Sequence, residues 1–134
     1  MKNIFTVLFL LFVFTGYGQS YLGNSSNRAV ITWKNDIHDF GKIKQGKPVS
    51  IIYKFKNDGL KPLIIKKVVS SCGCTVPEYP RIPIRPMSGG EIKATFDSKK
   101  VGVFSKSVSV TTNASEKPKV LILKGEVIPI VIIK

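Results

Sequence analysis

Two cysteines separated by one glycine, Cys72-Gly73-Cys74, are the residues of this chain with the widest choice of chemistry. They follow an apolar run (residues 63–69) and precede a proline-rich stretch (residues 77–86). The pair can act as structural small hydrophobes or free thiols at the end of a strand. It can instead form a disulfide, bind a soft metal such as Cu(I) or Zn, or bridge to another chain. The sequence leaves these interpretations open.

The disulfide interpretation carries its own expectations. Bridging residues i and i+2 requires a tight turn, and we expect Gly73 to provide it through a positive φ. So small a ring closes almost no chain entropy, and a strained ring is easily reduced. A bridge between Cys72 and Cys74 is therefore predicted to be redox-active more than stabilising.

A metal site would need a further ligand. His38 is the only histidine of the chain and is the candidate to join the two thiolates. Two sulfurs and one imidazole leave a tetrahedral site incomplete. We therefore expect no bound cofactor, and the metal that such a site would prefer stays undetermined.

His38 also opens the segment His38-Asp39-Phe40-Gly41. A histidine beside an aspartate is compatible with general-base chemistry. An aromatic residue followed by glycine is more typical of a packing and turn device, so we assign Phe40 and Gly41 a structural role. The sequence has no nucleophile elbow, no phosphate-binding glycine-rich turn before a helix and no pair of carboxylates in one loop. We expect a protein that is not an enzyme.

The first residues of the chain have the pattern of a secretory signal peptide. Lys2 precedes an apolar run (residues 4–14) that is too short to cross a bilayer as a helix. Gly16 and Gly18 supply small residues before a cleavage site ahead of Gln19. We predict export to the periplasm or the extracellular space. The predicted organisation is a signal peptide over residues 1–18, a flexible leader over 19–28 and one domain over 29–134.

The chain has 134 residues and a formal net charge of +13. Its lysines are scattered and often alternate with apolar residues, as on solvated strand faces. This distribution argues against nucleic acid as a partner. It favours an envelope protein or an acidic envelope surface, and we expect no transmembrane segment in the mature chain.

Apolar residues alternate with polar ones through most of the chain, and turn residues separate these runs. We predict an all-β protein, an immunoglobulin-like antiparallel β-sandwich of about seven strands, with a small barrel as the second choice. The more fully apolar residues 63–69 are expected to form a central strand, and residues 77–86 an edge or crossover segment. The predicted core is Trp33, Phe40, Ile51, Tyr53, Phe55, Ile65, Phe96, Val108, Val110, Leu121 and Leu123.

Several blocks together resemble a bacterial family of exported domains, domain-of-unknown-function family fifteen-seventy-three. The blocks are HDFG at 38–41, YKFKNDGLKPLII at 53–65, SSCGCTVPEYP at 70–80, and the strands at 91–98, 102–114 and 120–127. The resemblance implies an immunoglobulin-like sandwich related to major-sperm-protein and pilus-chaperone domains, export, and no assigned activity. We thus expect a protein-interaction or scaffolding module of the cell envelope. The alternative is a soft-metal-binding or thiol-redox protein that uses Cys72 and Cys74.

Overall fold

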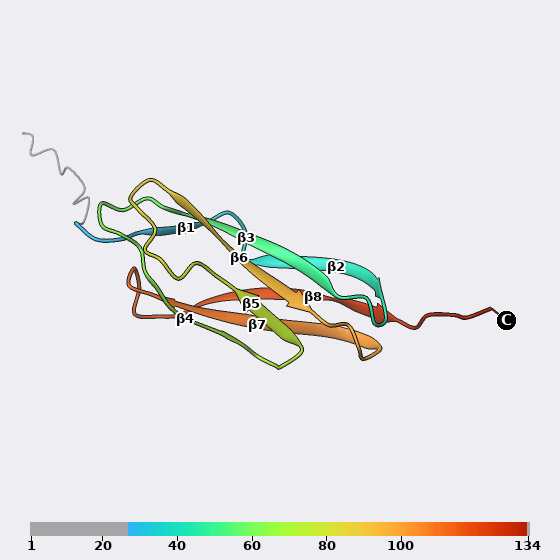
Figure 1. Ribbon diagram of the computed structural model, residues 1–134. Coiled ribbons are helices and arrows are strands. Elements are labelled where there is room, and N and C mark those ends of the chain that lie inside the picture. Colours follow the sequence, from blue (N-terminus) through green and yellow to red (C-terminus); the bar gives the residue numbers. More distant parts are fainter. Residues whose placement is uncertain (1–26, 134) are drawn as a thin grey trace, which may run out of the picture.

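A computed structural model describes residues 27–133, so the predicted signal peptide (1–18) and most of the predicted leader (19–28) lie outside the described residues. The described part is built from strands packed in two layers (Figure 1). The strands are β1 (Ile31–Trp33), β2 (Ile37–Lys44), β3 (Val49–Asn57), β4 (Ile65–Ser70), β5 (Thr75–Glu78), β6 (Gly89–Phe96), β7 (Gly102–Thr112) and β8 (Lys119–Ile128).

The eight strands form two sheets of four. The first sheet has the order β1-β3-β6-β5, and the second has the order β2-β8-β7-β4. The predicted immunoglobulin-like sandwich is confirmed, with eight strands where the sequence indicated about seven. One pairing differs from the antiparallel expectation, because β2 and β8 run parallel, with His38 opposite Leu123. The chain crosses to the other sheet after β1, and alternation along a strand carries no information on the direction of its partner.

Most of the predicted core is buried between the sheets. Eight of the eleven predicted residues are buried, and Trp33, Phe40 and Ile51 are half-buried against them. Leu63 and Ile84 are also buried and form an isolated bridge outside the strands, where alternation gives no signal. The buried apolar residues beyond the predicted set are Ala29, Leu63, Ile84, Ile92, Ala94, Phe104 and Val127.

The prediction of a central strand over residues 63–69 is wrong. Only Ile65–Ser70 form β4, which is an edge strand beside β7. Ile64 and Val69 keep 44% and 46% of their surface exposed, because the second sheet is covered on one face only. A β-branched composition favours a strand but does not say where in a sheet that strand lies.

The proline-rich stretch begins in an edge strand, as predicted. β5 pairs only with β6, and Pro77 lies opposite Ala94. Edge strands tolerate proline because one side of the backbone needs no partner. The connection between the two sheets lies earlier than expected, in residues 71–74 between β4 and β5. The two cysteines therefore sit where the chain crosses from one layer to the other.

Tyr53 ties the two layers together. Its ring is fully buried on β3, and its hydroxyl donates a hydrogen bond of 2.7 Å to the Ile122 carbonyl on β8. Burial, with a smaller contribution from the negative charge of Asp36, raises the pKa of Tyr53 to about 12. The phenol therefore stays protonated and keeps donating across the core at neutral pH.

Candidate functional site

Cys72 and Cys74 are joined by a disulfide, with Cα atoms 5.3 Å apart. Both residues are half-buried, and Cys74 packs against the hydrophobic core. Residues 27–133 contain no free cysteine. The bridge thus lies in a short loop that is anchored to the core on one side and open to solvent on the other.

Hydrogen bonds from both sheets hold this loop in place. The Ser70 hydroxyl donates to the Cys72 carbonyl over 2.8 Å, and the backbone N–H of Asp97 donates to the Cys74 carbonyl over 3.0 Å. Ser70 ends β4 in the second sheet, and Asp97 follows β6 in the first. The two carbonyls beside the bridge are therefore fixed by different layers, so the disulfide is presented in a defined orientation.

The backbone of Gly73 does not meet our expectation. Among the glycines of the described chain, Gly41, Gly46 and Gly102 have positive φ values and Gly73 does not. A Cβ atom added at Gly73 would meet no heavy atom within 4 Å. The turn that brings the cysteines together therefore does not require a glycine.

Gly73→Ala is accordingly expected to change the free energy of unfolding by less than about 1 kcal/mol and to leave the disulfide intact. Gly41→Ala is the matched comparison, because a Cβ there also meets open space but the φ of Gly41 is +65°. That backbone conformation costs an alanine about 1–2 kcal/mol. Denaturant unfolding and a thiol count on both variants make the test. Equal losses, or a free thiol in Gly73→Ala, would contradict it.

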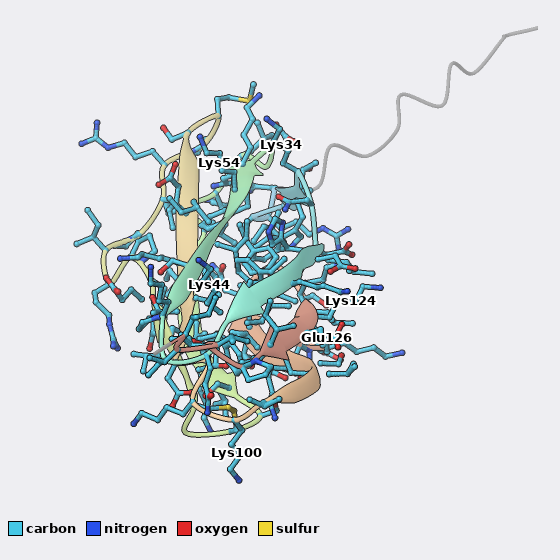
Figure 2. All side chains as sticks on the ribbon, turned by 90° about the vertical axis from the view of Figure 1, so that its right-hand side faces the viewer. Lys34, Lys44, Lys54, Lys100, Lys124 and Glu126 are labelled. Atoms are coloured by element: carbon cyan, nitrogen blue, oxygen red, sulfur yellow. A yellow bond between two sulfur atoms is a disulfide. The ribbon has the colours of Figure 1, made fainter. Side chains whose placement is uncertain are left out.

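A pocket of about 450 Å³ opens beside the disulfide. Phe96 and Phe104 contribute apolar walls, and their rings stack with centroids 4.1 Å apart. The charged lining consists of Lys99, Lys100 and Lys106 against one aspartate, Asp97. Figure 2 shows Lys100 on the same side of the molecule as the yellow disulfide bond. The disulfide thus forms part of the wall of a cationic pocket.

Thr75 contacts the bridge directly. Its Oγ1 lies 3.8 Å from the Cys72 Sγ, and the residue is only 2% exposed. A disulfide sulfur carries no proton, so the Thr75 hydroxyl is the donor in this contact. We did not predict this residue from the sequence, although its position directly after Cys74 could have suggested it. No sequence pattern near the cysteines indicated Lys99, Lys100 and Lys106, because these lysines reach the pocket from the β6–β7 connection and from β7.

The structure does not bring His38 to the cysteines. His38 lies on β2 at one edge of the second sheet, whereas Cys72 follows β4 at the opposite edge. The His38 ring meets the Phe40 ring edge-on, with centroids 4.5 Å apart. Across residues 27–133, no three His, Cys, Asp or Glu side chains are grouped so as to hold a metal ion. The two cysteines and His38 therefore do not assemble as a ligand set.

Phe40 and Gly41 lie at an irregularity of β2. The Gly41 backbone N–H donates to the Asp39 carboxylate over 2.8 Å, and Gly41 has a φ of +65°. The pairing of β2 with β8 shifts register between Asp39 and Lys42. Phe40 packs against the core from this point. The geometry thus forms a turn-like bulge that places an aromatic ring.

Comparisons with known proteins support the same fold. Among solved structures, a protein of unknown function from Porphyromonas gingivalis W83 matches with a TM-score of 0.67 and 16% identity over 77% of this chain and 49% of that one. The ASH/PapD-like domain 7 of human CEP192 matches with a TM-score of 0.64 and 12% identity over 80% of this chain and 89% of that one. The VesB protease of Vibrio cholerae matches with a TM-score of 0.56 and 9% identity over 75% of this chain and 32% of that one.

These likenesses show the fold alone. The chain spans about half the length of the Porphyromonas protein and about a third of VesB. None of the curated proteins matches the chain significantly. The model of one family does match, over residues 31–127, which include every strand from β1 to most of β8. The chain belongs to the family described as protein of unknown function (DUF1573).

Proposed function

We propose that this protein is an exported binding module of the bacterial cell envelope and not an enzyme, and that it joins a partner protein by strand addition through residues 129–133. We call these residues the apolar segment. The observation that carries the proposal is the exposure of this segment, and export rests on the signal peptide expected over residues 1–18.

The apolar segment leaves the sandwich after β8 and runs outward along the long axis of the molecule (Figure 1). Its side chains are among the most exposed apolar groups of the described chain. Ile130, Val131, Ile132 and Ile133 keep 53%, 79%, 81% and 91% of their surface exposed. Four consecutive large apolar residues in water are unusual in a folded protein and favour a site of association.

The chemistry of the segment suits a strand. All four side chains are β-branched, and such residues favour extended backbone. The pairing of β8 ends at Val127 with β7 and at Ile128 with β2, so residues 129–133 have no ladder partner within the described chain. An extended peptide that joins a sheet edge binds through its main chain and gains specificity from alternate side chains. The apolar segment meets both conditions, because its main chain has no ladder partner in the described chain and its side chains are exposed.

Two further features, the disulfide and the net charge, fit an envelope location. A disulfide persists in oxidising compartments, and the chain contains one at Cys72–Cys74. The described residues include no helix of the length and apolar character needed to span a bilayer. The chain without residues 1–18 loses only the charge of Lys2, and its formal charge of +12 (13 − 1) would increase the rate of encounter with an acidic partner or surface.

Proline substitution tests strand addition, because it removes one backbone N–H without adding charge. We expect at least one of Val131→Pro and Ile132→Pro to abolish the complex that the native protein forms in envelope extracts, since alternate N–H groups face the partner strand. Val131→Ala and Ile132→Ala keep the N–H and should retain most of the complex. Size analysis of the native complex followed by immunoblotting gives the readout.

Two outcomes would overturn the proposal. Retention of the complex in both proline variants would show that backbone pairing by the segment is not used. Binding of the purified protein to vesicles of acidic phospholipid, lost in the alanine variants, would show that the segment contacts lipid instead of a strand.

A further inference from the structure

We propose that the Cys72–Cys74 disulfide is a reactive group that exchanges with a pair of thiols on an acidic peptide segment, which the lysine-lined pocket receives. This inference is independent of strand addition by the apolar segment, because it concerns different residues and a different chemistry. The protein would act as a stoichiometric reactant, one disulfide for one pair of thiols.

The position of the bridge makes exchange possible. Cys72 and Cys74 are half-buried and line a pocket, so we expect an incoming thiol to reach the bridge without unfolding of the sandwich. The ring spans a single intervening residue, so its closure restricts the unfolded chain very little. The bridge therefore adds little to stability by that route, and its loss should leave the core intact.

The charge of the pocket selects the partner. Lys99, Lys100 and Lys106 line it against the single carboxylate of Asp97. Lys99 lies 4.0 Å from Asp97, so its charge is partly offset, whereas Lys100 and Lys106 have no carboxylate partner among the salt bridges of the described chain. Two uncompensated cations beside a disulfide attract an acidic peptide and stabilise a thiolate. The apolar walls of Phe96 and Phe104 can receive the side chains next to its cysteines.

The contact of Thr75 with Cys72 indicates which sulfur of the bridge is attacked and which one leaves. A partner thiolate attacks the Cys74 Sγ, forms a mixed disulfide with it, and breaks the Cys72–Cys74 bond, whose electron pair leaves on the Cys72 Sγ. The Thr75 hydroxyl, already 3.8 Å from that sulfur, donates to the new thiolate. A leaving thiol of lower pKa departs faster, so this hydrogen bond favours cleavage in that direction.

The second step completes the redox balance. The second thiolate of the partner attacks the partner sulfur of the mixed disulfide, and Cys74 leaves as a thiolate. The partner is oxidised from two thiols to a disulfide, and the protein is reduced from a disulfide to two thiols. The two protons released by the partner's thiols end on Cys72 and Cys74 or in solvent.

The test uses two synthetic peptides, each with two cysteines, one flanked by glutamates and one by lysines. Reduction of the folded protein by each peptide is monitored through alkylation of the newly formed thiols and mass spectrometry. We expect the acidic peptide to react at least about tenfold faster at low salt, with the difference shrinking as salt screens the lysines. Lys100→Glu should weaken this preference, and Lys100→Glu combined with Lys106→Glu should abolish or reverse it.

Charge-matched and hydroxyl-matched controls separate the site from a general field. Lys34 lies on the side of the molecule opposite Lys100 in Figure 2 and is absent from the pocket, so Lys34→Glu should leave the preference unchanged. Thr75→Val should slow exchange about tenfold and raise the pKa at which the reduced Cys72 is alkylated, whereas Thr75→Ser should retain both. Unfolding midpoints show which variants remain folded.

Equal rates with the two peptides would overturn the proposal, as would equal effects of Lys34→Glu and Lys100→Glu. Failure of the native disulfide to react with either peptide, while the unfolded protein reacts, would show that the bridge is only structural.

Discussion

Asn57→Leu is expected to lower the free energy of unfolding by about 3–5 kcal/mol, because one buried amide serves four backbone groups. The Asn57 carboxamide oxygen accepts from the N–H groups of Val30 and Gly59, at 3.3 and 3.0 Å. Its NH₂ group donates to the carbonyls of Lys61 and Ile84, at 2.8 and 3.0 Å. Leucine fills a similar volume but leaves all four backbone groups without this partner.

Denaturant unfolding of Asn57→Leu measures the effect, and Asn113→Leu is the control. Asn113 also bonds to a backbone N–H and a carbonyl, those of Ile64 and Pro62, but in an exposed loop where water can replace the side chain. Its loss should cost about 1 kcal/mol or less. A loss below 1 kcal/mol at Asn57, or equal losses at both positions, would show that the Asn57 network does not hold this end of the sandwich together.

Phe55→Ala is expected to cost about 3–5 kcal/mol, the second large effect. Phe55 is 4% exposed on β3, and its ring packs against Trp33 with centroids 5.1 Å apart. Its register partner on β6 is Gly90, where an added Cβ would lie 2.4 Å from the Phe55 Cζ. The absence of a side chain at position 90 thus makes room for the ring.

This contact predicts a coupling between the two positions. Gly90→Ala alone should cost about 1–3 kcal/mol, because the new methyl overlaps the Phe55 ring. In the Phe55→Ala background the same methyl enters the cavity and should cost nothing or stabilise the protein. Unfolding of the wild type, both single variants and the double variant gives the coupling energy. Additive losses would show that residues 55 and 90 do not share one space.

The core was predictable because it depends on short-range pattern. Residues that alternate with polar neighbours on long strands, such as Phe55 and Val108, are buried as expected. Leu63 and Ile84 were missed because two loops bring them together. Asn57 precedes Asp58 and Gly59 in a typical turn sequence, and its side chain does bond to Gly59 two residues on. Its bonds to Val30 and Ile84 depend on tertiary structure and have no local signal.

The residues of the candidate site were likewise predictable where they are close in sequence and unpredictable where tertiary structure brings them together. Cys72 and Cys74 are two residues apart, so a bridge between them was open to prediction, and Thr75 follows directly. Lys100 and Lys106 lie more than 25 residues further along the chain, and only the crossing between sheets brings them to the disulfide. His38 is a suitable metal ligand by its chemistry, but it lies on β2, at the edge of the second sheet opposite β4 and the cysteines that follow it.

Strand addition through the apolar segment is the central claim, and site-specific photo-crosslinking in the native host tests it most directly. A photoreactive amino acid placed at Val131, which is 79% exposed, should yield one discrete cross-linked product of the envelope fraction. The same group at Ile82, which is 76% exposed, provides the control for exposure alone and should yield none. A discrete product from position 131 alone is the result that strand addition predicts. No product from position 131, or the same product from both positions, would contradict it.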